Sequence, residues 1–209
     1  MGEVAIPEYD LLIVGGGING CGIARDAAGR GLRVLLCEQH DLAQHTSSAS
    51  SKLIHGGLRY LEQFEFRLVH EALTEREILL RTAPHIIRPM RFVLPHVPAL
   101  RPAWIIRAGL LLYDTLARRD ILPASQRINL ATPPYDSGLQ AHIRTGFIYS
   151  DCWVDDARLA LANARAAREL GATVLTQTEC VSATRKEGLW PPAATQTPPV
   201  MATSKSPSS

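Results

Sequence analysis

Near the start of the chain, short apolar runs flank a segment whose apolar residues recur at helical intervals. "YDLLIVGGG" places an apolar run before three glycines, which predicts a buried strand and its turn. "INGCGIARDAAGRG" follows with apolar residues at helical intervals and with glycines at its end. "LRVLLCE", Leu32 to Glu38, predicts a second strand. Together these elements make a βαβ unit of about 30 residues, the length that such a crossover needs.

The next segments predict a helix followed by extended chain. Residues 61–83 favour a helix with a polar face on which Glu71 and Glu75 lie beside Arg76. The apolar positions of this helix are predicted to be Leu68, Ala72, Ile78 and Leu79. Residues 84–102 are rich in proline, which indicates extended or turning chain.

Residues 81–127 are both basic and apolar. They carry eight arginines, no lysine and only two aspartates. Within them, residues 103–117 predict a helix that is apolar around most of its circumference. Two interpretations stay open: the helix is buried in the full protein, or it dips into the lipid interface. Trp104 and Tyr113 suit a headgroup boundary, and the arginines suit anionic lipid.

A last helix is predicted by "VDDARLALANARAARELG", with Asp155 or Asp156 at its start and Gly171 ending it. The paired aspartates also resemble a catalytic dyad, but a carboxylate that caps free amides explains them more simply. "ATVLTQTECVSA" then favours β structure. The predicted order is therefore β-α-β, a long insertion, and α-β.

Composition narrows the class of protein. The 209 residues are 46% hydrophobic and 20% charged, with a net charge of +2, which fits a globular chain of one or two domains and gives no reason to expect nucleic acid as a partner. The four cysteines show no metal-ligand spacing, so we expect reduced thiols and a cytoplasmic setting. The first ten residues lack the apolar core of a signal peptide, and no run is long enough to span a membrane.

The end of the chain differs in character from the rest. Residues 190–209, "WPPAATQTPPVMATSKSPSS", contain five prolines, show no periodicity and cannot bury enough apolar area to offset the entropy of ordering. We expect this tail to be disordered. The predicted domains are therefore an α/β domain over residues 1–189, interrupted by the insertion at 81–127, and the tail.

A glycine motif lies between the first predicted strand and the first predicted helix. Gly15, Gly17 and Gly20 match G-x-G-x-x-G, in which the glycines serve a sharp turn, close approach to a pyrophosphate and tight packing of helix on strand. Glu38 ends the second strand, where an acid accepts hydrogen bonds from a ribose diol and repels a 2′-phosphate. The motif predicts a dinucleotide, FAD or NAD, rather than NADP.

The stretch "SSASSKLIHGGLRYL", Ser47 to Leu61, suggests a flavin. Hydroxyls there could hold the pyrophosphate and ribityl chain of a dinucleotide that leaves the glycine loop, and Gly56-Gly57 would let a flat ring lie against the backbone. His55 is a candidate base and Arg59 a candidate anion binder. For His55 the alternative is a hydrogen-bonded structural histidine. Together these features suggest a flavin that oxidises an anionic substrate.

At these residues the chain closely resembles the N-terminal part of the FAD-dependent (aerobic) glycerol-3-phosphate dehydrogenases. The segments that carry the resemblance are "DLLIVGGGINGCGIARDAAGRGL", "TSSASSKLIHGGLRYLEQFEFRLVHEAL", "APHIIRPMRFVLPH", "LRPAWIIRAGLLLYD" and "YSDCWVDDARLALANA". The resemblance implies part of a Rossmann-like FAD fold of the glutathione-reductase type. It also implies oxidation of sn-glycerol 3-phosphate to dihydroxyacetone phosphate, with electrons passed to membrane quinone.

The resemblance also assigns residues. The FAD-binding βαβ is matched by Gly15, Gly17, Gly20 and Glu38. The segment that runs along the cofactor is matched by Thr46, Ser47, Ser51, Lys52 and Leu53. His55 matches a residue beside the reactive flavin edge, and Arg59 matches one that grips the substrate phosphate. No metal ligand is implied.

Two alternatives accompany this expectation. An amino-acid or 2-hydroxyacid oxidase has the same fold, because only Arg59 and its neighbours indicate a phosphate. The resemblance covers roughly residues 9–190, and family members continue well beyond it. We therefore expect this chain to be a fragment that is inactive alone, and a non-catalytic remnant is the second alternative. A cytoplasmic location, at the inner face of the cytoplasmic membrane, would accompany quinone reduction.

Overall fold

The computed structural model describes residues 9–97, 99, 101–140, 142–181 and 195–196. They fall into two compact units, the first from within residues 1–50 and 156–209, and the second from residues 51–155. The predicted domain boundary at 189/190 lies outside the described residues, as does the predicted disordered tail apart from Thr195 and Gln196.

The first unit contains a three-stranded parallel sheet with the order β1-β2-β7. Its strands are β1 (Leu11–Val14), β2 (Val34–Cys37) and β7 (Thr173–Leu175), and its helices are α1 (Ile18–Gly29) and α4 (Asp156–Glu169). The α/β class and the predicted βαβ unit are confirmed. A short pair, β8 (Glu179–Cys180) with β9 (Thr195–Gln196), follows.

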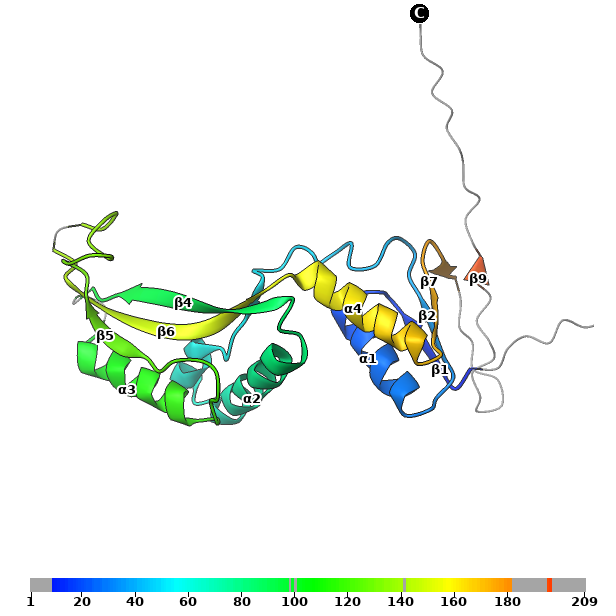
Figure 1. The fold of residues 1–209 in the computed structure, drawn as a ribbon, viewed down its shortest axis with the longest axis horizontal. Helices are drawn as coiled ribbons and strands as arrows, with labels where there is room; N and C mark the ends of the chain where they lie inside the picture. Colours follow the sequence, from blue (N-terminus) through cyan, green and yellow to red (C-terminus); the bar gives the residue numbers. More distant parts are fainter. Residues whose placement is uncertain (1–8, 98, 100, 141, 182–194, 197–209) are drawn as a thin grey trace, which may run out of the picture. The chain divides into compact units, whose positions relative to one another are not determined.

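The core of the first unit forms where α1 and α4 pack together beside the sheet (Figure 1). The buried cluster is Ile13, Cys21, Ala24, Ala27, Ala28, Val34, Leu36, Ala164, Ala167 and Ala172. Alanine methyls on both helices allow their backbones to approach closely, and the larger side chains come from the strands. Helical spacing of small apolar residues in the sequence therefore did mark the buried face of α1.

The second unit is built on an antiparallel sheet around one long strand. β6 (Thr145–Val154) pairs along its length with β4 (Ile87–Pro95), from Ile87 opposite Val154 to Pro95 opposite Gly146. β3 (Leu53–Ile54) and β5 (Gln126–Asn129) also pair with β6. Proline is tolerated in β4 because, among the described strands, it pairs only with β6 and so behaves as an edge.

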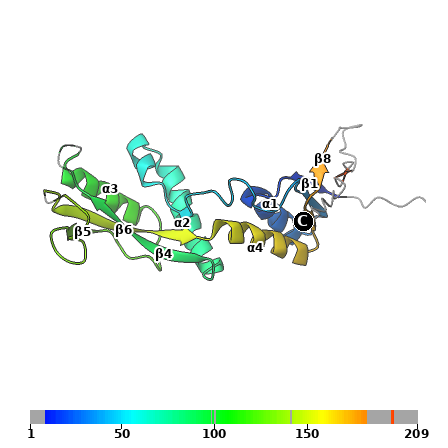
Figure 2. The same ribbon diagram turned by 90° about the horizontal axis from the view of Figure 1, so that it is seen from above.

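Two helices pack on this sheet. α2 (Phe66–Thr82) and α3 (Ala103–Thr115) share a buried cluster of Val69, Leu73, Tyr113 and Ala117, against which Tyr149 of β6 packs. In both ribbon views α3 runs beside β6 (Figure 1, Figure 2). The predicted helix at 103–117 is confirmed, and the predicted extended segment at 84–102 contains β4.

The predicted helix over residues 61–83 is wrong at its start. A 3₁₀ helix covers Leu58–Gln63, and α2 begins only at Phe66. Between them Phe64 has a φ of 60°, a left-handed conformation that interrupts a right-handed helix.

The predicted face of α2 is also wrong. Arg76 is 1% exposed, whereas Leu68 and Ile78 are 46% and 42% exposed. The buried residues of α2 are Val69, Leu73, Arg76, Glu77 and Leu80. Arg76 therefore does not lie on a solvent face with Glu71 and Glu75, because it belongs to the side that packs on the sheet.

The apolar helix α3 divides its aromatic residues between core and surface. Trp104 is 71% exposed, whereas Tyr113 is 2% exposed, so Tyr113 does not fit the headgroup boundary that its sequence position suggested. Asp114 is also buried and pairs with Arg119 at 2.7 Å. Among the described residues, no helix is both long and apolar enough to cross a bilayer.

Candidate functional site

The glycine turn links the end of β1 to the start of α1. Gly15 has a φ of +109°, a conformation that L side chains rarely adopt. A Cβ on Gly20 would lie 2.0 Å from the carbonyl oxygen of Gly15, so only glycine lets the helix approach the turn this closely. These are the turn and packing roles that the motif predicted for the two glycines.

A serine hydroxyl from a distant loop lies at the amino end of α1. The backbone N–H of Ile18 donates to Ser47 Oγ at 2.8 Å, and a Cβ on Gly17 would lie 3.1 Å from the same oxygen. The serine thus satisfies one free amide of the helix terminus, where a phosphate would be favoured by the remaining amides and the helix dipole. Thr46 precedes it and is exposed.

Glu38 follows β2 directly and is only 7% exposed. Its Oε2 accepts from the N–H of Gly16 at 2.7 Å, and its Oε1 accepts from the N–H of His40 at 2.8 Å. Burial by itself raises the pKa of Glu38, but these two backbone bonds, together with the nearby His40 and His45, outweigh it, so the pKa is lowered. The carboxylate is held charged beside the glycine turn, with lone pairs left to accept further bonds.

A pocket of about 300 Å³ lies at the carboxyl ends of β1 and β2. Its lining residues are Val14, Gly15, Cys37, Glu38, Gln39, His45, Thr178, Glu179 and Cys180. This edge of a parallel α/β sheet is where ligands bind in such folds. Burial, followed by the neighbouring Cys180 and Glu38, raises the pKa of the Cys37 thiol, so Cys37 is an unreactive wall of the pocket rather than a nucleophile.

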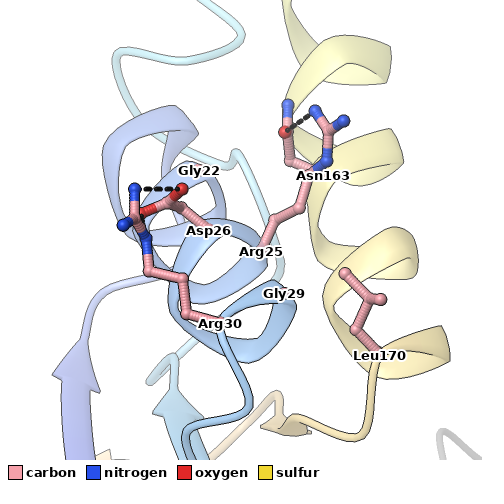
Figure 3. Close-up of a pocket in the computed structure, with 7 residues that line it drawn as sticks. All are labelled: Gly22, Arg25, Asp26, Gly29, Arg30, Asn163 and Leu170. Carbon is pink, nitrogen blue, oxygen red and sulfur yellow. Dashed lines mark hydrogen bonds and ion pairs between the residues drawn. The ribbon is translucent and has the colours of Figure 1, made fainter.

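A larger hollow of about 550 Å³ lies between α1 and α4 on the helix side of the same unit (Figure 3). Its two arginines are already engaged, Arg25 with Asn163 at 3.3 Å and Arg30 with Asp26 at 2.8 Å. No residue predicted from the sequence to bind cofactor or substrate lines it. The strand-end pocket is therefore the better candidate despite its smaller volume.

The remaining predicted site residues belong to the second unit. Ser51 is exposed, Lys52 has a φ of +56°, and Leu53 in β3 pairs with Trp153 in β6. His55 follows β3, and Arg59 lies in the 3₁₀ helix; both are exposed. The structure thus gathers Gly15, Gly17, Gly20, Glu38, Thr46 and Ser47 in the first unit, and Ser51, Lys52, Leu53, His55 and Arg59 in the second.

The glycine pair beside His55 is explained by the packing of the chain itself. A Cβ on Gly56 would lie 2.3 Å from Leu73 Cδ2 and 2.7 Å from the hydroxyl of Tyr113. Gly57 has a φ of +69°, and its Cβ would lie 2.5 Å from the ring of Tyr60. Close approach of a flat ring is therefore not needed to account for these two glycines.

A buried polar network lies beneath this turn, and sequence reasoning missed it. The N–H of Gly56 donates to the Tyr113 hydroxyl at 2.7 Å, which donates to Asp151 Oδ1 at 2.7 Å. Arg76 Nη1 also donates to Asp151 Oδ1, at 2.6 Å. Tyr113, Asp151 and Arg76 are each no more than 3% exposed. Burial and the Asp151 carboxylate raise the pKa of Tyr113, so its hydroxyl stays protonated.

One feature of the sequence could have revealed this network. Val69, Leu73, Arg76 and Leu80 follow one another at intervals of four, three and four, the spacing of one helix face. A cation among three buried apolar positions needs a buried partner. That partner, Asp151, comes from β6, which the sequence analysis had not assigned to any element.

The paired aspartates before α4 take the structural role. Asp156 is the first residue of α4, and its Oδ1 accepts from the N–H of Ala157 at 2.9 Å. Its Oδ2 accepts from the Ser50 hydroxyl at 2.6 Å. The helix-start interpretation is supported, and a catalytic dyad is not needed to explain the pair.

Comparison with known proteins assigns the family. A sequence model of the family described as FAD dependent oxidoreductase matches residues 10–198, which is most of the chain and reaches past Trp190. The chain belongs to the FAD-dependent oxidoreductases. The α/β strand–turn–helix, the acid after β2 and the pocket at the strand ends are thus parts of a flavoprotein fold.

Individual relatives within this FAD-dependent family are very similar. A glycerol-3-phosphate dehydrogenase of Pseudomonas aeruginosa is 69% identical over 182 residues, which cover 87% of this chain and 35% of that protein. A D-erythritol 1-phosphate dehydrogenase of Brucella abortus is 61% identical over 188 residues, 90% of this chain and 38% of that protein. The chain therefore spans little more than a third of the length of these relatives.

Among solved structures, a glycerol-3-phosphate dehydrogenase from Bacillus halodurans complexed with FAD matches with a TM-score of 0.60 and 29% identity, over 88% of this chain and 29% of that one. The predicted FAD fold is therefore confirmed. The first unit of this chain has features that fit the adenosine end of FAD. Gly15 has a backbone conformation that other residues rarely adopt, a Cβ on Gly20 would meet the backbone of Gly15, and the Glu38 carboxylate supplies an acceptor beside the pocket.

Proposed function

We propose that this chain is the N-terminal, cofactor-binding part of an FAD-dependent dehydrogenase of glycerol 3-phosphate. The observation that carries the proposal is the strand-end pocket, in which a buried, charged Glu38 lies beside the Gly15–Gly20 turn. Acceptors of that kind bind a ribose diol, and the free amides at the start of α1 suit a pyrophosphate. FAD, when bound, accepts the hydride released from C2 of the substrate.

We assign the substrate-binding end of the proposed site to residues of the second unit. Ser51, Lys52 and Leu53 are proposed to lie along the cofactor, His55 beside the substrate hydroxyl, and Arg59 on its phosphate. The 3₁₀ helix presents Arg59 exposed to solvent, and none of the ion pairs found within the described residues involves it. A guanidinium fork suits a phosphate because it donates two parallel hydrogen bonds.

The cofactor is tested directly with purified chain. We expect flavin absorbance bands, or uptake of added FAD with an affinity at least about tenfold above that for FMN, because the glycine turn and Glu38 address the adenosine half, which FMN lacks. Glu38→Gln should weaken FAD binding, and Gly22→Ala, in α1 with open space at its Cβ position, should not. Equal binding of FMN and FAD would contradict the assignment.

Arg59 is tested in a version of the protein extended to the length of its relatives. Arg59→Leu should raise KM for glycerol 3-phosphate by about 10²-fold, since a bond to a charged group contributes roughly 1.5–3 kcal/mol. Arg67→Leu, at another exposed arginine, on α2, that pairs with Glu71, is the control. An unchanged KM in Arg59→Leu would remove its assigned role.

The identity of the phosphorylated alcohol needs a separate comparison. The Brucella relative acts on D-erythritol 1-phosphate by its name and is almost as similar to this chain as the Pseudomonas glycerol-3-phosphate dehydrogenase is. Both substrates carry a phosphate and a secondary hydroxyl. The ratio of kcat/KM for the two esters decides between them, and we expect glycerol 3-phosphate, oxidised to dihydroxyacetone phosphate, to be preferred. Substantial activity on 2-hydroxyacids or amino acids would favour the other oxidase classes.

We further propose that the 209-residue chain does not turn over substrate alone, and that electrons of the complete enzyme pass to membrane quinone. The first point follows from its span of about a third of its relatives' length. The second is supported by α3, in which Trp104 is 71% exposed and Leu111 is 53% exposed within a basic stretch.

Membrane contact is tested by flotation with anionic vesicles. We expect salt-sensitive flotation that is reduced by Trp104→Ser. Flotation that is absent or independent of salt would instead favour burial of this face.

A further inference from the structure

The ring of His55 is held from the protein side by the turn that follows it. The backbone N–H of Gly57 donates to His55 Nδ1 at 3.0 Å. A backbone amide is always a donor, so Nδ1 must carry a lone pair while this bond is present. In a neutral imidazole the proton is then on Nε2, at the opposite edge of the ring. His55 is exposed, and within the described part of the chain no hydrogen bond to its Nε2 is found.

The amide that makes this bond is fixed by its own neighbours. Gly57 adopts the left-handed conformation with a φ of +69°, and its Cα lies against the Tyr60 ring. The preceding residue, Gly56, is buried and anchored through its N–H to Tyr113. The Gly57 amide is thus set between a residue anchored through its N–H and a residue in the left-handed conformation, and rotating it away from His55 would change the ψ of Gly56 and the φ of Gly57.

The anchor itself is held by the bonds that join its members. Tyr113 donates to Asp151 at 2.7 Å. Arg76 pairs with Asp151 at 2.6 Å and with the buried Glu77 at 3.5 Å, and its Nε has no hydrogen-bond partner within the described residues. These residues come from three separate elements, α3, β6 and α2, whose packing fixes their side chains. Buried polar networks of this kind hold one arrangement, since any unpaired member would be strongly disfavoured at this depth.

We propose that the Arg76–Asp151–Tyr113 network positions the Gly56–Gly57 turn so that His55 is held in the tautomer with its proton on Nε2. If the function proposed above holds, His55 meets the substrate oxygen as a hydrogen-bond donor. Acceptance of the hydroxyl proton by Nε2 would require the other tautomer, in which an Nδ1–H faces the Gly57 N–H across 3.0 Å. Arg76, Asp151 and Tyr113 are positioning residues, because they act through the turn.

Ring nitrogen-15 spectra of the full 209-residue chain, labelled at histidine, test the tautomer. Above about pH 8, where an ordinary imidazole is neutral, we expect the His55 signal, identified by its loss in His55→Gln, to show a protonated Nε2 and an unprotonated Nδ1. One hydrogen bond biases such an equilibrium by roughly tenfold. The Gly56 and Gly57 amides should be protected from hydrogen exchange. A proton on Nδ1, an even mixture of tautomers, or unprotected amides in the wild-type chain would overturn the proposal.

The network is tested with a matched pair of tyrosines. Tyr113→Phe removes the nearer acceptor of the Gly56 N–H, at 2.7 Å, and leaves only Asp151 Oδ1 at 3.4 Å. We expect faster Gly56 amide exchange, by about tenfold, and a loss of tautomer preference at His55. Tyr149→Phe is the control, because its ring contacts that of Tyr113 at 6.3 Å between centroids and Asp151 forms no hydrogen bond to it within the described structure. Unchanged spectra in Tyr113→Phe would remove the positioning role.

Both measurements are made without cofactor or substrate. A failure to bind FAD therefore leaves the tautomer result intact, and a wrong tautomer leaves the assignment of the FAD pocket intact. The two proposals fail separately.

Discussion

The two units of this chain present their functional residues on different kinds of backbone. In the first unit, the glycine turn and Glu38 are 23 residues apart at most, and adjacent parallel strands bring them together. In the second unit, the turn beside His55 is supported by Tyr113 and Asp151, which lie 57 and 95 residues beyond Gly56. A site built from neighbouring segments can be found in a sequence motif, whereas one supported by distant strands cannot.

The two units also differ in how charge is buried. Glu38 is held mainly by backbone amides of its own vicinity, those of Gly16 and His40. Asp151 is held by an arginine and a tyrosine from two helices. Loss of one partner is therefore expected to lower the unfolding free energy more in the second unit than in the first. The variants below are ordered by their expected effect on the unfolding free energy, from the largest to the smallest.

Arg76→Met should have the largest effect. It leaves the Asp151 carboxylate buried without its cationic partner, and removal of one member of a buried pair costs about 3–5 kcal/mol of unfolding free energy. Urea denaturation measures the change, and amide exchange should place it in α2 and β6. The control is Arg67→Met on the exposed side of the same helix, where the side chain is 91% exposed and no measurable change is expected. Equal stability of the two variants would show that the buried network contributes little.

Gly20→Ala tests the packing of the first unit. Its Cβ would lie 2.0 Å from the backbone oxygen of Gly15, and overpacking of this kind costs about 3 kcal/mol. FAD binding should be lost with it, because the turn must move. Gly22→Ala in the same helix meets nothing within 4 Å and should instead stabilise α1 by about 0.5–1 kcal/mol. Thermal denaturation of both variants checks the opposite signs.

Glu38→Gln should destabilise by about 2 kcal/mol at neutral pH, since the amide cannot accept from both Gly16 and His40. The pKa of Glu38 is lowered in the folded chain, so its stabilisation is present above the unfolded pKa of about 4.3 and is lost as the pH falls through the folded value. The difference between wild type and variant should therefore shrink on acidification below about pH 4. A difference that stays constant down to pH 2 would contradict the assigned charge.

Ser47→Ala should have the smallest effect. The N–H of Ile18 at the start of α1 would lose its acceptor, at a cost of about 1 kcal/mol. The matched change is Ser48→Ala, whose hydroxyl bonds to a carbonyl within its own exposed turn, and a smaller loss is expected there. Denaturant midpoints compare the two. If Ser48→Ala proved the more destabilising, the helix terminus would not depend on Ser47.

Several elements could be predicted from the sequence because their causes are local. The apolar run before three glycines, the helical spacing of Cys21, Ala24 and Ala28, and the glycine after α4 each encode a strand, a helix face or a helix end within a few residues. The position of Glu38 after β2 follows from the same pattern. Apolar spacing and backbone freedom act over one or two turns of chain, so they can be read without a partner.

Tertiary structure alone decided the rest. Burial of Arg76 on the packed face of α2 depends on Asp151 in β6, and the role of Tyr113 depends on Gly56, both from far along the chain. The sequence supplied a cation, a phenol and a carboxylate with no local sign that they meet. A buried charge is stable only beside its partner, and it is the antiparallel pairing of β6 with the strands around it that provides that partner.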